Sequence, residues 1–214
     1  SRDCGYEYIA ITDHSPTLGI TKGLTEEKIY KQIEEIKKIN KKYKDFRILA
    51  GIEVDIRENG QLDLPNSILK ELDIVVASIH TKFNLPKDQM TKRIIKALEN
   101  EVVDILGHPT GRLLGKREPY QVDMEKIIEA ARANHKVLEL NGCPDRLDLT
   151  DIYLRQAKDK GVKIAISTDS HKNLHLQDWM RYGLGMARRG WLEKKDVVNT
   201  LPLEKFLKFF DLKK

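Results

Sequence analysis

Residues 74–80 read Ile-Val-Val-Ala-Ser-Ile-His, a nearly continuous apolar run that ends in a histidine. Similar runs recur along the chain, and most are followed by a segment with the pattern of an amphipathic helix. Runs of this kind are typical of parallel strands that are covered on both faces. They predict strands at residues 6–12, 48–52, 74–79, 102–107, 137–140 and 162–167. The alternation of strands and helices predicts an α/β fold with a parallel sheet.

Helices are expected between these strands. Thr25 is placed to cap the first one, with Glu26 and Glu27 in the first turn, where carboxylates suit the helix dipole. Isoleucines repeat with helical spacing over residues 29–39, which predicts that they form the buried face of this helix. Further helices are expected near residues 87–100, 123–134 and 150–160.

The spacing of the strand ends narrows the fold class. The strand-closing residues are His14, Glu53, His80, His108, Asn141 and Asp169, separated by 27 to 39 residues. One strand–helix unit takes about 30 residues, so six units predict a (β/α) barrel that lacks one or two strands. The length of 214 residues fits one domain over residues 1–214. In such barrels the carboxyl ends of the strands form the rim of the active site.

The composition excludes several classes of protein. With 40% hydrophobic and 33% charged residues, the chain is neither disordered nor a coiled coil. No apolar run is long enough to cross a bilayer, and two cysteines exclude a disulfide framework, so a cytoplasmic protein without a membrane partner is expected. The net charge of +5 weakly favours an anionic partner. Because the chain opens with Ser1 and not methionine, we expect it to be a piece of a longer protein.

Metal-binding residue types stand at the strand ends. The candidate ligands are His14, Glu53, His80, His108, Asp169 and His171. A single histidine after a strand is more often a hydrogen-bonded residue than a ligand, so the prediction rests on the whole set. Nitrogen and carboxylate ligands of this kind bind zinc, manganese and iron, and they predict a buried centre with Glu53 as a bridging carboxylate. His135 follows a helix and is expected to be structural, and the role of His175 stays open.

The chemistry expected of such a centre is hydrolysis of phosphate esters by metal-activated water. No nucleophile elbow, phosphate-binding loop or dinucleotide fingerprint is present in the sequence. Glu53, His80, His108 and Asp169 are therefore the predicted catalytic residues. Arg112, Arg117 and Arg146 follow two of the strands and are the predicted phosphate-binding residues, with surface ion pairs as the alternative.

The strand-end motifs resemble those of the PHP (polymerase and histidinol phosphatase) family. They are Thr12-Asp-His14, Gly51-Ile-Glu53, Ser78-Ile-His80, Gly107-His-Pro109 and Thr168-Asp-Ser-His171. The segments at residues 111–119, 144–149, 180–191 and 199–203 are similar to the C-terminal PHP domain of bacterial and archaeal family X DNA polymerases. The resemblance extends over essentially the whole chain.

The resemblance implies a distorted (β/α)7 TIM-like barrel that holds up to three zinc, manganese or iron ions. It implies that Glu53, His80 and His108 bind one metal, that Asp169 binds a neighbouring metal bridged by Glu53, and that His14 and His171 bind a third. It also implies a phosphoesterase that acts on DNA 3′ ends in repair, as a 3′–5′ exonuclease, a 3′-phosphatase or a phosphodiesterase. The implied partners are DNA and the polymerase region of the parent chain.

The sequence departs from the family pattern at its beginning. The Asp-x-His-x-His motif of the first family strand is not matched, so we expect an N-terminally truncated barrel with fewer than three metals and impaired activity. Two alternatives stay open: a free-standing phosphatase for small phosphomonoesters such as histidinol phosphate, and a non-catalytic DNA-binding or interaction module. The role of Cys143 also stays open.

Overall fold

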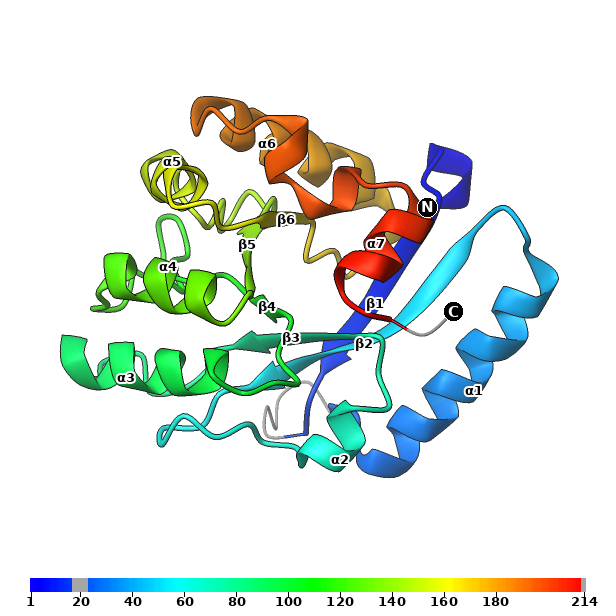
Figure 1. The fold of residues 1–214 in the computed structure, drawn as a ribbon, viewed down its shortest axis with the longest axis horizontal. Coiled ribbons are helices and arrows are strands. Elements are labelled where there is room, and N and C mark those ends of the chain that lie inside the picture. Colours follow the sequence, from blue (N-terminus) through cyan, green and yellow to red (C-terminus); the bar gives the residue numbers. More distant parts are fainter. Residues whose placement is uncertain (17–22, 213–214) are drawn as a thin grey trace.

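A single parallel sheet organises the chain (Figure 1). The computed structural model describes residues 1–16 and 23–212. Within them, six strands pair in the order of the sequence, each with the next one along the chain. The strands are β1 (Tyr8–His14), β2 (Arg47–Asp55), β3 (Ile74–Ser78), β4 (Ile105–Leu106), β5 (Val137–Asn141) and β6 (Ile164–Ser167). The sheet curls as part of a barrel does (Figure 1), which confirms the predicted α/β fold of TIM-like barrel type.

Most of the helices lie outside the curled sheet (Figure 1). The α-helices are α1 (Glu26–Lys42), α2 (Asn66–Leu69), α3 (Lys87–Leu98), α4 (Met124–Ala133), α5 (Asp151–Asp159), α6 (Leu176–Arg189) and α7 (Leu203–Phe209). Short 3-10 helices lie at η1 (Arg2–Cys4), η2 (Asn173–His175), η3 (Lys194–Asp196) and η4 (Val198–Thr200). Within the described residues, no helix is long and apolar enough to span a membrane.

The register of the parallel strands brings the predicted site residues together at the carboxyl ends of the strands. His14 at the end of β1 pairs with Glu53 of β2, and Glu53 pairs with Val76 of β3. His80 and His108 lie at the same end of the sheet, because they follow the carboxyl ends of β3 and β4. Because parallel strands point the same way, side chains far apart in the sequence meet at their carboxyl ends.

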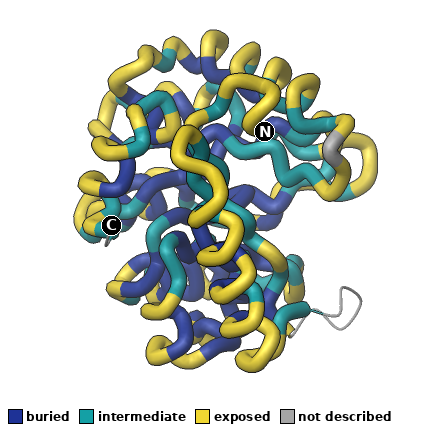
Figure 2. Tube along the Cα trace, turned by 90° about the vertical axis from the view of Figure 1, so that its right-hand side faces the viewer, coloured by how far each residue is buried: buried dark blue, intermediate teal, exposed yellow. Residues whose placement is uncertain are grey.

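Apolar side chains bury both faces of the sheet. A large cluster fills the space between the sheet and the outer helices and includes Ile29, Ile52 and Ile94. A smaller cluster on the inner face includes Leu49 and Ile74, and it packs against α7. Figure 2 shows the buried residues along the strands and the exposed residues on the outer turns of the helices. The chain thus forms a core without a disulfide bond.

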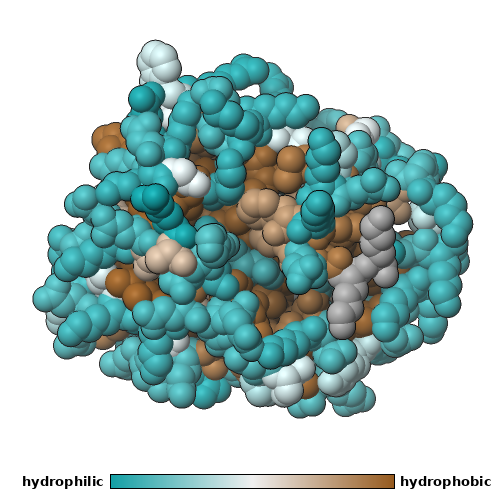
Figure 3. Space-filling model, viewed as in Figure 1, coloured by the Kyte–Doolittle hydropathy of each residue, from teal (hydrophilic) through white to brown (hydrophobic). Residues whose placement is uncertain are grey.

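The inner face of the sheet is open between β1 and β6, which are the edges of the sheet in the described part of the chain. The space holds a cavity of about 1060 Å³ whose walls include Ile9, Ile105 and Phe206. In the orientation of Figure 1, the space-filling view shows apolar side chains at the centre of the molecule, framed by hydrophilic ones (Figure 3). The Asn199 side chain covers part of the β6 edge, because it accepts from Ile166 N–H at 3.0 Å and donates to Ile166 O at 2.8 Å.

Several boundaries differ from those predicted. Strand β4 is limited to Ile105–Leu106, because residues 101–102 form a turn shortly before it. The Thr25 side chain makes no capping hydrogen bond, so the predicted side-chain cap of α1 is wrong. Ile39 was expected on the buried face of α1 but is 37% exposed, since it lies in the last turns, beyond the packed part of the helix. Helices α6 and α7 were not predicted.

Candidate metal centre

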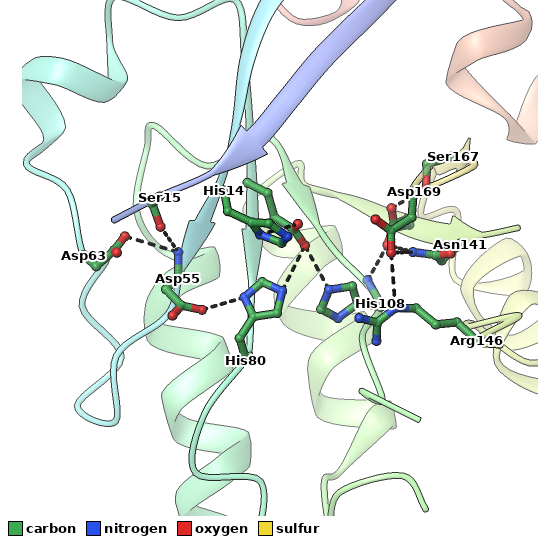
Figure 4. A network of polar contacts seen from close by, with 12 residues as sticks. His14, Ser15, Asp55, Asp63, His80, His108, Asn141, Arg146, Ser167 and Asp169 are labelled. Atoms are coloured by element: carbon green, nitrogen blue, oxygen red, sulfur yellow. Dashed lines mark hydrogen bonds and ion pairs between the residues drawn. The ribbon is translucent and has the colours of Figure 1, made fainter. Parts of the chain in front are cut away.

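His14, His80 and His108 lie close together (Figure 4), and all three contact the Glu53 carboxylate. Its Oε2 is 3.1 Å from His14 Nδ1, and its Oε1 is 2.9 Å from His108 Nε2 and 3.4 Å from His80 Nε2. The Glu53 carboxylate is 12% exposed and the His108 ring 2% exposed. The ring centroids of His14 and His80 are 5.0 Å apart, and those of His80 and His108 are 5.1 Å apart. Three strand ends thus direct imidazole nitrogens at one carboxylate.

The donor set fits a divalent metal ion. Ligand atoms of His14, Glu53 and His80 all lie within 4.8 Å of one another. Among the described residues, His14 Nδ1 and His80 Nε2 are buried and have no hydrogen-bond partner, although both face the Glu53 carboxylate. A buried nitrogen without a partner is costly, and coordination of a cation satisfies it. His14, Glu53 and His80, with His108 beside them, are therefore the residues that would hold a metal.

The protonation states of Glu53 and the histidines around it depend on one another. Burial opposes ionisation of Glu53, but the imidazoles of His108, His14 and His80 around its carboxylate hold its pKa well below the usual range. Burial also opposes protonation of His80, but the hydrogen bond with Asp55 and the nearby Glu53 carboxylate raise its pKa to about 9. Because a histidine must be neutral to ligate a metal, metal binding at this group is coupled to the release of protons.

Asp55 orients one of the histidines. Its carboxylate is buried, and Asp55 Oδ1 lies 2.7 Å from His80 Nδ1. With Nδ1 bonded to Asp55, the Nε2 atom of His80 is the one that faces Glu53. Carboxylates commonly orient metal-ligating histidines in this way. The signal in the sequence was the spacing of Glu53 and Asp55, because residues two apart on a strand point to the same face.

The predicted ligands Asp169 and His171 belong to a second polar group. Asp169 follows β6, and its Oδ2 accepts from Arg146 Nε at 3.2 Å and from Asn141 Nδ2 at 3.2 Å. His171 is 70% exposed, and its Nδ1 lies 3.0 Å from the main-chain oxygen of Asp169. The His171 ring centroid is 6.2 Å from that of His14. Both groups line the same cavity, and the metal-binding roles of Asp169 and His171 stay predictions.

The three predicted phosphate-binding arginines have different surroundings. Arg112 uses Nε and Nη2 to donate to the main-chain oxygens of Arg146 and Leu147. Arg117 donates from Nε to Gly111 O at 2.9 Å, and its guanidinium carbon lies 3.7 Å from the Phe83 ring centroid. The Nη1 atom of Arg146 is buried and has no hydrogen-bond partner among the described residues. Roles of these arginines toward a substrate stay predictions.

Glu139 was missed by the sequence analysis, which counted it within an apolar strand. It is 8% exposed and lines the same cavity as Glu53 and Asp169. Burial, reinforced by the charges of Asp169 and Glu53, raises the pKa of Glu139 to about 7. The signal that could have found it is that Glu139 is the single charged residue of residues 137–141.

The other two histidines take no part in the Glu53 group. His135 is exposed and follows α4 with a φ of 55°. His175 ends η2, and its ring stacks on Trp179 with centroids 4.7 Å apart. Cys143 is a free, partly buried cysteine whose main-chain N–H donates to Asn141 Oδ1 at 3.0 Å.

Known proteins are similar to this chain in sequence or in fold. The PHP domain family matches residues 1–142. The chain is 47% identical over 207 residues to the DNA polymerase/3′-5′ exonuclease PolX of Bacillus subtilis (strain 168), a match that covers 95% of this chain and 36% of that protein. It is 36% identical over 206 residues to a probable phosphatase of Thermoanaerobacter sp. (strain X514), covering 92% of this chain and 79% of that protein.

A solved structure shows the same fold at low sequence identity. Histidinol phosphate phosphatase from Lactococcus lactis subsp. lactis Il1403, in complex with zinc, L-histidinol and phosphate, matches with a TM-score of 0.60 and 18% identity. The match covers 89% of this chain and 84% of that one. The solved structure shows the fold, and the phosphatase relatives support the expected enzyme class, a metal-dependent phosphoesterase. On the extent of the family match and the identity to the phosphatase relative, the chain belongs to the PHP domain family.

Proposed function

We propose that the chain, as one domain over residues 1–214, hydrolyses phosphate esters at DNA 3′ ends. The reaction is that of a 3′–5′ exonuclease, a 3′-phosphatase or a phosphodiesterase, with Mn²⁺, Zn²⁺ or Fe²⁺ as the metal. The observation that carries the proposal is the convergence of His14, His80 and His108 on Glu53 at the carboxyl ends of adjacent strands. The 47% identity to the polymerase and exonuclease relative supports DNA as the substrate.

The chain's own residues provide binding, orientation and charge. A divalent metal, when bound, supplies activation of water and stabilisation of charge on the phosphate oxygens. Glu53 supplies the negative charge that holds a cation, and Asp55 keeps His80 in the orientation for ligation. Arg146 lies beside Asp169, and its Nη1 atom has no hydrogen-bond partner among the described residues, which supports a role of Arg146 in binding a substrate phosphate. Arg117, stacked on Phe83, is a second candidate for that role.

The chain spans 36% of the length of the polymerase relative. From the similarity to this relative we infer that the polymerase region of a parent chain is its partner. We also propose that the protein acts in the cytoplasm, as expected from the sequence. A second candidate function is hydrolysis of small phosphomonoesters such as histidinol phosphate. The probable phosphatase from Thermoanaerobacter favours it, because the match covers 79% of that protein, which leaves little of it outside the matched region.

The test compares three substrates: a 3′-phosphorylated oligonucleotide, a recessed DNA duplex and p-nitrophenyl phosphate. Each is incubated with chelator-treated chain before and after addition of Mn²⁺. We expect Mn²⁺-dependent hydrolysis of the DNA substrates, abolished by Glu53→Gln or His80→Ala and retained by the matched control His135→Ala. Hydrolysis of p-nitrophenyl phosphate alone would favour the small-phosphomonoester function. Binding of DNA without hydrolysis of any substrate would favour a non-catalytic module.

A further inference from the structure

A buried carboxylate, that of Glu139, connects the Glu53 group with the second polar group, which contains Asp169. Glu139 lies in β5, all five residues of which are buried. Burying a carboxylate is costly unless its oxygens are hydrogen-bonded. Here the main-chain N–H of His108 donates to Glu139 Oε2, and the Ser167 hydroxyl donates to Glu139 Oε1. The three residues belong to three adjacent strands: His108 follows β4, Glu139 is the central residue of β5, and Ser167 ends β6.

The hydrogen bond to His108 falls where the backbone is unusual. His108 has a φ of 26°, a region that side-chain-bearing residues rarely adopt. Its ring is 2% exposed, and its Nε2 lies 2.9 Å from Glu53 Oε1. Such conformations persist only where surrounding contacts hold them. The Glu139 carboxylate holds the main chain of His108 at the point that sets the direction of the ring.

A second connection runs from Glu139 toward Asp169. Asn141 Nδ2 lies 3.5 Å from Glu139 Oε2 and 3.2 Å from Asp169 Oδ2. Asn141 is fully buried, so its amide has few other ways to arrange itself. Glu139 therefore contacts one residue that faces Glu53 and a second that orients Asp169. A carboxylate that served only to tie the strands together would not need to meet the site residues on both sides.

We propose that Glu139 is a positioning residue of the metal centre: as a hydrogen-bond acceptor it fixes His108 in the orientation that ligates a metal beside Glu53. The proposal rests on the proposed function only in requiring that this centre holds a metal. The oxygen that accepts from His108 N–H carries the role, so an amide of the same shape should substitute for the carboxylate, with its oxygen toward His108 and its NH2 group donating to the Ser167 hydroxyl. Removing a residue that orients a metal ligand typically weakens metal affinity by about 10- to 100-fold.

The experiment measures the Kd for Zn²⁺ by competition with a chromogenic chelator, using the chelator-treated chain. Glu139→Ala is expected to weaken binding by about 10- to 100-fold, and Glu139→Gln to stay within about threefold of the wild type. The matched control is Ile127→Ala, a buried residue of α4, which should lower stability and leave the Kd of the folded protein unchanged. Recovery by glutamine and the unchanged control separate positioning from a general loss of packing.

Other outcomes have defined meanings. Wild-type affinity in Glu139→Ala would overturn the proposal, and so would a Glu139→Gln variant as weak as Glu139→Ala, because charge would then be the cause. If Glu139→Ala does not fold, Ser167→Ala takes its place, with an expected loss of about 3- to 10-fold. An unchanged Kd in Ser167→Ala would then overturn the proposal. Glu53→Gln is measured in parallel: if it also binds Zn²⁺ like the wild type, both the centre and the proposed function fail, whereas its loss of binding confines any failure to Glu139.

Discussion

Replacing Asp104 by asparagine should stabilise the protein at neutral pH and not in acid. Asp104 precedes β4 at the end of the sheet opposite the metal centre, and its Oδ2 accepts from Val75 N–H at 2.8 Å. Burial raises the pKa of the Asp104 carboxyl from 3.8 to about 6, although the hydrogen bond from Val75 and the charge of Lys136 oppose this. An asparagine oxygen at the same place can accept the same hydrogen bond and carries no charge.

The sign follows from proton binding. Below a pH of about 4 the carboxyl is protonated in both the folded and the unfolded chain, so it does not affect stability. Between about 4 and about 6 the folded chain binds more protons than the unfolded chain, so stability falls as pH rises. The gap between the two pKa values corresponds to at most about 3 kcal/mol of unfolding free energy. Because Asp104 is only partly buried, we expect about 1–2 kcal/mol.

Urea unfolding of the metal-free chain, followed by tryptophan fluorescence, measures this effect. At about pH 4 the variant and the wild type should have nearly equal free energies of unfolding, and by about pH 7.5 the variant should be more stable by about 1–2 kcal/mol. Asp88→Asn, at an exposed position, controls for the change in net charge. A difference between variant and wild type that does not change with pH, or that favours the wild type at neutral pH, would refute the reasoning.

Three further outcomes are expected. Asp55→Ala should weaken Zn²⁺ binding by about 10- to 100-fold in a chelator competition, because His80 loses the carboxylate that orients it. Arg117→Ala should raise the KM for a 3′-phosphorylated oligonucleotide, each charge-assisted contact being worth about 1.5–3 kcal/mol. It should lower the melting temperature less than Arg112→Ala does, because the Arg112 guanidinium holds two main-chain oxygens and that of Arg117 holds one. Elemental analysis should return about one tightly bound metal per chain, a value that three tightly bound metals would contradict.

The order of the strands and the position of the Glu53 group could be predicted from the sequence. Both depend on local patterns: apolar runs set the strands, and the residue after each run reaches the same edge of a parallel sheet. The positions of His14 and Glu53 next to each other follow directly from the strand register. Helices α6 and α7 were not predicted, although α7 covers the inner face of the sheet through contacts such as that of Phe206 with Tyr8.

Contacts made across the sheet could not be predicted in the same way. Glu139 lies within an apolar strand, and only the fold shows that His108 and Ser167 reach its oxygens from the adjacent strands. The partners of Arg112 depend equally on tertiary structure, because the loop at residues 143–149 supplies the main-chain oxygens. A basic residue after a strand therefore predicts proximity to the rim and leaves its partner undetermined.

The fold fixes the distances within the Glu53 group more firmly than it fixes the distance from this group to Asp169 and His171. His14, Glu53, His80 and His108 come from β1 to β4, so adjacent strands fix their separations through main-chain pairing. Asp169 and His171 follow β6. In the described part of the chain, β1 and β6 are the two outermost strands of the sheet, and the sheet connects them only through the strands that lie between them. The separation of His171 from His14 thus depends on the curl of the whole sheet. Since metal ligation needs atoms held within a few tenths of an ångström, the Glu53 group should bind its metal first and most tightly.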